Sequence, residues 1–295
     1  MAVVLQELWL AILLEKFRFT STWAAGLKSE SSFVGNNVIH LNEIGADPTV
    51  LIDNTVYPIL TTTREDQDIT VALKKYETTN TRITDDELYG LPYDKPGSVM
   101  AQHRITLEQG MLAHGLYTIA PLSNTARTPI IVTSGEDDGT GRRRMTPGDI
   151  IRLKRMYDDA KIPKEGRKLV LAPEHSEDLL LASQVFREQY HIIATGQLLP
   201  LYGFELHEDV NAPVYNVGTK VRKAYGAASA PATDANASVA FYNARCFQAL
   251  GTNKMYHRES ALDPETRSSV CGFRQWGIMM PYSRDSQAAI ISGRV

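Results

Sequence analysis

Residues 61–87 read TTTREDQDITVALKKYETTNTRITDDE, a charged stretch with eight threonines and only six apolar residues. Threonine disfavours helices because its branched Cβ restricts χ1, and it favours the pleated surface of a strand. Ile69, Val71 and Leu73 alternate with polar or small residues, which is the period of a half-buried strand. The polar run at residues 64–68 is typical of a turn. The stretch therefore predicts an extended β-hairpin with its tip at residues 64–68.

Such a hairpin buries too little apolar surface to be stable by itself, because an isolated two-stranded hairpin is marginal in water. We expect it to lie on a neighbouring copy of the same chain, which favours assembly over catalysis. Charged residues of both signs at the tip and along the strands are candidates for that contact: Arg64, Glu65, Asp66, Asp68, Lys74, Lys75 and Arg82.

The overall composition is that of an ordinary globular protein with one large or two small domains. The chain has 295 residues, of which 43% are hydrophobic and 22% charged, and its formal net charge is -3. A dedicated nucleic-acid binder usually carries a basic domain or stripe, so this charge argues against that class. Cys246 and Cys271 lack metal-ligand spacing and predict two reduced, buried thiols.

The first fourteen residues predict a short amphipathic helix, because their apolar residues recur at helical spacing. Gln6 and Glu7 interrupt the run and no basic residue precedes it, which argues against a signal peptide. The run is too short to span a bilayer, and the absence of Lys and Arg before Lys16 disfavours the alternative of an interfacial membrane helix. Its apolar face is a second set of candidate contacts between subunits: Leu5, Leu8, Trp9, Ile12 and Leu13.

The rest of the chain alternates predicted strands and helices. Residues 21–37 predict a polar, extended arm, and Val38, Ile39 and Leu41 a short strand. Asp94 and Pro96 form a helix-start signal for one long helix that runs to about Thr118. Beyond it the pattern predicts, in order, a strand at 129–134, a charged glycine-rich loop at 135–144, a helix after Thr146 that ends before Pro163, a strand at 169–172, a helix from Pro173, strands within 198–207, a flexible loop at 224–238, a helix at 241–250 and closing strands at 270–278 and 287–291.

No motif assembles a nucleophile, a base and an oxyanion hole. HExxH, GxSxG, GxGxxG and GxxxxGK[ST] are absent. Glu174 and Glu177 around His175 are interpreted as carboxylates at a helix N-terminus, where the helix dipole favours them, rather than as an acid–base site. The run 207–209 fits a cation site or a strand-end loop, and the arginines at 142–144, beside three acids, predict a solvated loop rather than a contact with nucleic acid. We therefore predict no catalytic residue, no metal ligand and no cofactor.

The order of these elements resembles the major capsid proteins of tailed bacteriophages, the Hong Kong 97-type capsid fold. The sequence KLVLAPEHSEDLLLASQVF at 168–186, followed by ATGQLLPLYGFELHEDVNAPVYN at 194–216, is similar to the strand, helix and next strand of the axial domain in that family. The sequences AFYNARCFQALG at 240–251 and LDPETRSSVCGFRQWGIMMP at 262–281 are similar to its returning strands. The resemblance covers nearly the whole chain and implies an α+β fold class. It implies an N-terminal arm at 1–54, an extended hairpin loop at 55–93, a peripheral domain with the spine helix at 94–128 plus 252–295, and an axial domain at 129–251.

The resemblance implies a structural protein and not an enzyme. It implies a homo-oligomer of hexamers and pentamers that self-assembles into an icosahedral shell of the virion. That shell encloses double-stranded DNA without sequence-specific binding, has no membrane, forms in the host cytoplasm, and has scaffolding and portal proteins as partners. Two alternatives remain: an encapsulin-like compartment for cargo enzymes, and a small hydrolase or nucleotide-binding enzyme.

This chain departs from many members of the family at its N-terminus. They carry a long N-terminal scaffolding segment, and this sequence has none, so we expect scaffolding to come from a separate protein or to be dispensable. Lys74 and Lys75 lie on the element that carries a cross-linking lysine in some members, and the sequence identifies no partner for such a bond.

Overall fold

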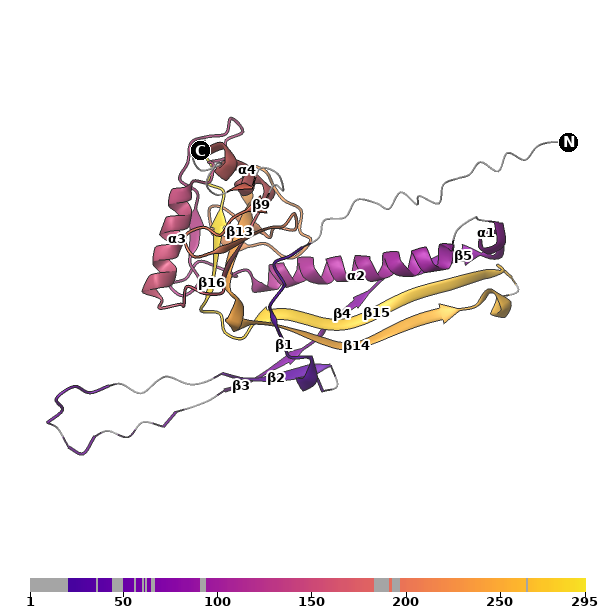
Figure 1. Ribbon diagram of the computed structural model, residues 1–295, viewed down its shortest axis with the longest axis horizontal. Helices are drawn as coiled ribbons and strands as arrows, with labels where there is room; N and C mark the ends of the chain where they lie inside the picture. Colours follow the sequence, from indigo (N-terminus) through magenta and orange to yellow (C-terminus); the bar gives the residue numbers. More distant parts are fainter. Residues whose placement is uncertain are drawn as a thin grey trace.

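The computed structural model describes residues 21–35, 37–43, 50–55, 57–59, 61, 63–64, 67–90, 94–182, 191–192, 197–263 and 265–295. The predicted N-terminal helix with its five contact candidates, as well as Glu65 and Asp66, lies outside these residues. Two sheets and four helices organise the described part of the chain as an α+β fold (Figure 1).

The longest helix is α2 (Lys95–Ile119), which confirms the predicted long helix. The Asp94 carboxylate accepts a hydrogen bond from the Gly97 N–H at 3.0 Å, and Pro96 stands in the first turn, where its missing N–H leaves no partner unsatisfied. The other α-helices among the described residues are α1 (Asp85–Gly90), α3 (Pro147–Asp159) and α4 (Pro173–Ala182). Both α3 and α4 begin at the predicted prolines.

The first sheet has five strands, in the order β1 (Lys28–Ser29), β14 (Cys246–Arg258), β15 (Ser268–Pro281) and β4 (Lys74–Glu77), with β5 (Thr81–Thr84) also paired to β15. β14 and β15 form a long antiparallel ribbon, and α2 lies along it (Figure 1). Two glycines permit this close approach. A Cβ at Gly115 would lie 2.7 Å from the Met279 sulfur, and one at Gly277 would lie 2.6 Å from Cε of Met111.

The second sheet has seven strands, in the order β10 (Glu205–Glu208), β7 (Arg167–Leu171), β13 (Asp234–Tyr242), β11 (Val214–Asn216) and β12 (Val221–Arg222). β16 (Gln287–Ile291) pairs with both β13 and β6 (Ile130–Val132). One face packs against α3 and α4 through Ile150, Leu153 and Leu179. The other face packs against Trp23 and against Leu116 and Ile119 from the end of α2. The sheet is therefore the middle layer of three.

A separate pair, β2 (Val38–Glu43) with β3 (Gln67–Ala72), corrects the predicted hairpin. Gln67 pairs with Glu43 and Asp68 with Asn42, so residues 67–68 belong to a strand and the tip lies between residues 43 and 67. The first hairpin strand thus falls in the segment predicted as the N-terminal arm. The base of the hairpin is held by a buried apolar cluster whose residues are distant in sequence: Ile39, Leu73 and Phe247. A second short pair joins β8 (His191–Ile192) to β9 (Gln197–Leu198).

Two further predictions are wrong. Residues 234–238 of the predicted flexible loop begin strand β13, because their small side chains, such as Ala237 and Ser238, allow close packing in the core. Residues 241–250 are not a helix. Phe241 belongs to β13 of the seven-stranded sheet and Phe247 to β14 of the five-stranded sheet, and the chain crosses between the two sheets at residues 243–245. The predicted closing strand at residues 287–291 is strand β16, and it pairs with β13 in the seven-stranded sheet.

Candidate subunit-contact surfaces

Lys74 and Lys75, two of the predicted contact residues, lie on opposite faces of the five-stranded sheet. Successive residues of a strand point to opposite faces, and directly paired residues point to the same face. Lys74 pairs with Gly277, against which Met111 of α2 packs, so Lys74 is on the face toward α2. Lys75 pairs with Trp276 and is on the face away from α2.

The face away from α2 carries five cations, which we call the basic stripe: Lys75, Arg82, Lys254, Arg258 and Arg274. Strand register places them there. Arg274 pairs directly with Lys254, and Val270 lies between Arg82 on β5 and Arg258 on β14. Like charges directly opposite in a sheet are destabilising. The positive charges on this face of the five-stranded sheet therefore do not stabilise the sheet itself.

Only part of this charge is balanced within the chain. Glu77 lies 2.9 Å from the Lys75 ammonium and 3.4 Å from Arg274, and Asp263 lies 2.6 Å from Arg258. The Tyr256 ring is between two cations, with its centroid 5.2 Å from Nζ of Lys254 and 4.9 Å from the Arg274 guanidinium. In the described part of the chain no carboxylate lies within ion-pair distance of Arg82 or Lys254. The stripe leaves net positive charge on an open sheet face.

Of the basic stripe, Lys75 and Arg82 are among the contact residues predicted from sequence, whereas Lys254, Arg258 and Arg274 are not. The signal was present as period-2 alternation, since Lys254, Tyr256 and Arg258 occupy alternate positions of one strand, as do Arg274 and Trp276 in the next. The alternation becomes informative once residues 252–258 are known to belong to strand β14, which local sequence does not predict.

The hairpin loop presents a second surface, which is apolar. Among its described residues, five large side chains are 54–84% exposed: Val50, Leu51, Ile52, Tyr57 and Ile59. The contact residues that the sequence predicts for this loop are charged, so these apolar side chains are an additional set. Arg64 lies in the loop, while Asp68 lies in β3. Clustered exposed apolar side chains mark surfaces that other molecules cover.

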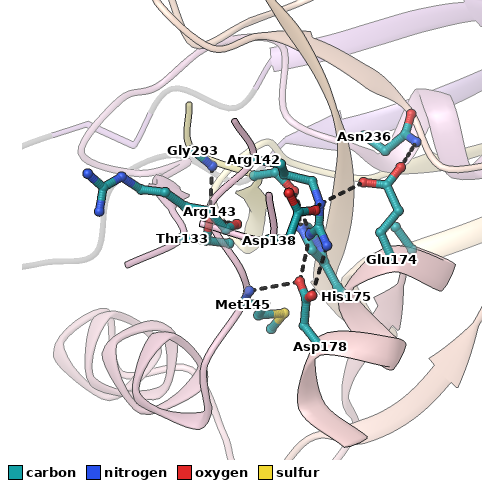
Figure 2. A network of polar contacts seen from close by, with 12 residues as sticks. Thr133, Asp138, Arg142, Arg143, Met145, Glu174, His175, Asp178, Asn236 and Gly293 are labelled. Carbon is teal, nitrogen blue, oxygen red and sulfur yellow. Dashed lines mark hydrogen bonds and ion pairs between the residues drawn. The ribbon is translucent and has the colours of Figure 1, made fainter. Parts of the chain in front are cut away.

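The glycine-rich loop is held by a buried polar network (Figure 2), which corrects the predicted solvated loop at Arg142. Asp178 on α4 accepts hydrogen bonds from Nη1 and Nη2 of Arg142 at 2.6 and 2.8 Å, and from the Met145 N–H at 2.9 Å. Asp138 accepts from Nε of Arg142 at 2.8 Å. The hydrogen bonds to Asp178 raise the pKa of the Arg142 guanidinium, and those from Thr140 are the main cause that lowers the pKa of Asp138. Sequence reasoning missed this network because Asp178 is 36 residues from Arg142.

His175 has no access to solvent and no free ring nitrogen. Nδ1 lies 2.6 Å from the Ser238 hydroxyl and Nε2 lies 2.8 Å from the Ser292 hydroxyl. Complete burial lowers its pKa to about 4, so the ring is neutral. The histidine joins α4, β13 and the C-terminal residues, and a substrate cannot reach it.

The acidic run at 207–209 anchors the N-terminal segment. The buried Asp209 carboxylate accepts hydrogen bonds from the Ser21 hydroxyl at 2.5 Å and from Nε1 of Trp23 at 2.9 Å. His207 Nδ1 lies 3.0 Å from the Thr22 hydroxyl. Residues 21–23 are therefore bound to the seven-stranded sheet, whereas the sequence predicted an extended arm.

Cys246 and Cys271 are free, buried thiols, as predicted, and burial raises the pKa of Cys246 to about 12. Within the described ranges, no group of three or more His, Cys, Asp or Glu side chains is arranged to hold a metal ion. No helix among the same residues is both long and apolar enough to cross a membrane.

Comparison with solved structures identifies the fold. A chain from Mycobacterium phage Che8 is 16% identical with a TM-score of 0.65, over 98% of this chain and 98% of that one. The capsid structure of the cyanophage P-SCSP1u matches at 13% identity and a TM-score of 0.65, over 99% and 94% of the two chains. The mature capsid of bacteriophage PhiM1 matches at 11% identity and a TM-score of 0.65, over 93% and 88%. Neither a protein-family profile nor a curated protein sequence matches the chain. The fold is that of phage capsid chains.

Proposed function

We propose that the protein is the major capsid protein of a tailed bacteriophage, with a structural rather than enzymatic role. The observation that carries this proposal is the likeness to capsid chains along almost the full length of both proteins. Copies of the chain assemble as hexamers and pentamers into an icosahedral shell that encloses double-stranded DNA. Scaffolding and portal proteins are its partners, and it assembles in the host cytoplasm before it becomes part of the virion.

The arrangement of the chain supports a contact between copies. The hairpin exposes apolar side chains such as Ile52 and Tyr57, and it carries the acidic run Glu65, Asp66 and Asp68 in its sequence. The basic stripe offers the opposite charge on an open sheet face. We assign the hairpin of one copy to the stripe of its neighbour. Apolar burial supplies most of the free energy of this contact, because an exposed ion pair contributes only about 0.2–1 kcal/mol.

The alternative of a small hydrolase is not supported by His175 and the two serines that contact it, because His175 is fully buried and both of its ring nitrogens lie at hydrogen-bond distance from those serines. The compartment alternative differs from the phage shell in its contents and not in its wall. Nucleic acid in particles purified from the native source favours the phage shell, whereas a co-purifying enzyme favours the compartment.

The decisive experiment is sedimentation and electron microscopy of the full chain, with a scaffolding protein supplied where the chain alone does not assemble. Closed shells with hexamers and pentamers are expected, at masses in the megadalton range. A chain that stays monomeric at all concentrations with scaffold present, or that turns over a substrate, contradicts the proposal.

A further inference from the structure

A cavity of about 300 Å³ lies at the end of the β14–β15 ribbon, on the face toward α2 and so opposite to the basic stripe. Its lining comes from four separate parts of the chain: the end of β5 with the start of α1, the first turns of α2, β14 and β15. The volume is at the lower end of the roughly 300–1,000 Å³ range of small-molecule sites. Because separate elements build it, the cavity exists only in the folded subunit.

The walls are apolar and adaptable. They are formed by Ile83, Pro96, Met100 and Met255, and Cys271 lies beside them in a buried cluster with Ile83. Methionine is unbranched and polarisable, so two methionine walls accommodate apolar bodies of different shapes. These side chains favour a planar or branched hydrocarbon group in the interior of the cavity.

Among the described residues, the polar lining is sparse and carries one formal negative charge. The half-buried Asp85 lines the cavity together with His257, Thr84 and Ser269, and Asp86 follows Asp85 in the same first turn of α1. Of the described residues that line the cavity, none is lysine or arginine. A ligand with a protonated amine at one end would place its charge beside Asp85 and its apolar body between the methionines.

From this lining we propose that the cavity is a binding site for small amphiphilic amines, with the ammonium group at Asp85 and the apolar group between Met100 and Met255. The site is a property of the single subunit. It is therefore independent of the proposed shell function, and failure of one leaves the other in place.

Cys271 provides the readout, because its thiol lines the cavity whereas that of Cys246 is completely buried in another cluster. The test measures the rate at which N-ethylmaleimide labels each cysteine of the unassembled full chain, by peptide mass spectrometry. The probes are benzylamine, benzyl alcohol and benzoate, which share a ring and differ in charge. We expect benzylamine to slow labelling of Cys271 at the lowest concentration and benzoate at the highest, with Cys246 unaffected.

Two variants separate the parts of the site. Asp85→Asn should reduce the advantage of benzylamine over benzyl alcohol by about two- to fivefold, the size of one partly exposed ion pair. Met255→Trp should fill the cavity and abolish protection by all three probes. Saturation-transfer NMR of the benzylamine ring protons, with Met255→Trp as the control, gives the same answer without the thiol. Equal protection by benzoate and benzylamine, or an NMR signal that survives Met255→Trp, overturns the proposal.

Discussion

The two large sheets of this protein differ in whether their charged side chains are paired within the chain. Around the seven-stranded sheet, buried charges find partners within the chain, as Arg142 does with Asp178 and Asp138. On the five-stranded sheet, Lys254 faces Arg274 across the strands, and the adjoining hairpin exposes Val50 and Ile52. The seven-stranded sheet is complete within one copy of the chain. The five-stranded sheet is incomplete by comparison, because it leaves cations without an ion-pair partner among the described residues, as expected of a face that the proposed neighbouring copy covers.

The largest expected effect on stability comes from Trp23, and it tests whether this residue is part of the core of the seven-stranded sheet. Its side chain is fully buried against Phe241, with ring centroids 6.0 Å apart, and it donates a hydrogen bond to Asp209. Trp23→Ala should lower the free energy of unfolding by about 3–5 kcal/mol, because it leaves a large cavity and removes one of the two hydrogen bonds that this buried oxygen of Asp209 accepts, the other coming from Ser21. Urea unfolding followed by circular dichroism measures it.

The matched control is a chain that lacks residues 1–19. It should unfold at the same denaturant concentration as the full chain and yet assemble poorly, if the N-terminal apolar face docks on a neighbour. If the truncated chain fails to fold, the helix predicted for the first fourteen residues belongs to the core of the subunit instead.

A smaller effect is expected from the buried network. Asp178→Asn removes the negative charge that faces Arg142 and should lower the free energy of unfolding by about 1–3 kcal/mol, because a buried guanidinium then lacks full compensation. Glu136→Gln, an exposed change in the same loop, is the control and should have no measurable effect. Equal stability of the two variants in thermal unfolding would contradict the role of the network.

The same region should respond to acid. The pKa of His175 is lowered to about 4 by burial, below the ordinary value near 6.5, so the unfolded chain binds this proton more readily. The contribution of His175 to the free energy of unfolding is therefore fully present above about pH 6.5 and is lost as the pH falls toward 4. The contribution of this one group between pH 7 and pH 5 is about 2 kcal/mol.

His175→Gln removes the titrating group and should flatten this part of the pH dependence, although it lowers stability at pH 7. Chemical unfolding at several pH values measures the slope for both proteins. Other histidines with lowered pKa, such as His207, contribute equally to both and cancel in the comparison. Parallel slopes would show that His175 is not the acid-sensitive group.

Prediction from sequence succeeded where the signal is local and failed where long-range packing decides. The start of α2 was predictable because Asp94 and Pro96 act within one turn, and α3 begins at Pro147 for the same reason. The prediction of a helix at residues 241–250 is wrong because these residues form strands with β7 and β15, and those partners are too distant in sequence for a local pattern to reveal them. The basic stripe required strand register, which places Lys254 beside Arg274, and no local pattern contains that information.

The smallest effect on subunit stability, and the sharpest test of the incomplete sheet, comes from reversing charges in the stripe. Lys254→Glu with Arg82→Glu replaces the two cations that have no ion-pair partner among the described residues. Lys254→Glu also removes the repulsion with Arg274, so the free energy of unfolding should stay within about 0.5 kcal/mol or rise slightly. Lys75 is less suitable for this test, because its reversal would place two carboxylates side by side at Glu77.

Assembly should respond in the opposite direction to stability. Each ion pair in a contact is weak, at about 0.2–1 kcal/mol, but the contact recurs between all neighbouring copies of a closed shell. The double variant should therefore assemble in lower yield, with the larger loss at low salt, where screening between exposed charges is weakest. Lys164→Glu, an exposed reversal beside the seven-stranded sheet, is the control and should assemble normally. Assembly that is indifferent to both the double variant and the salt concentration would assign the contact to the apolar side chains of the hairpin alone, and Ile52→Asp with Tyr57→Asp would then abolish it.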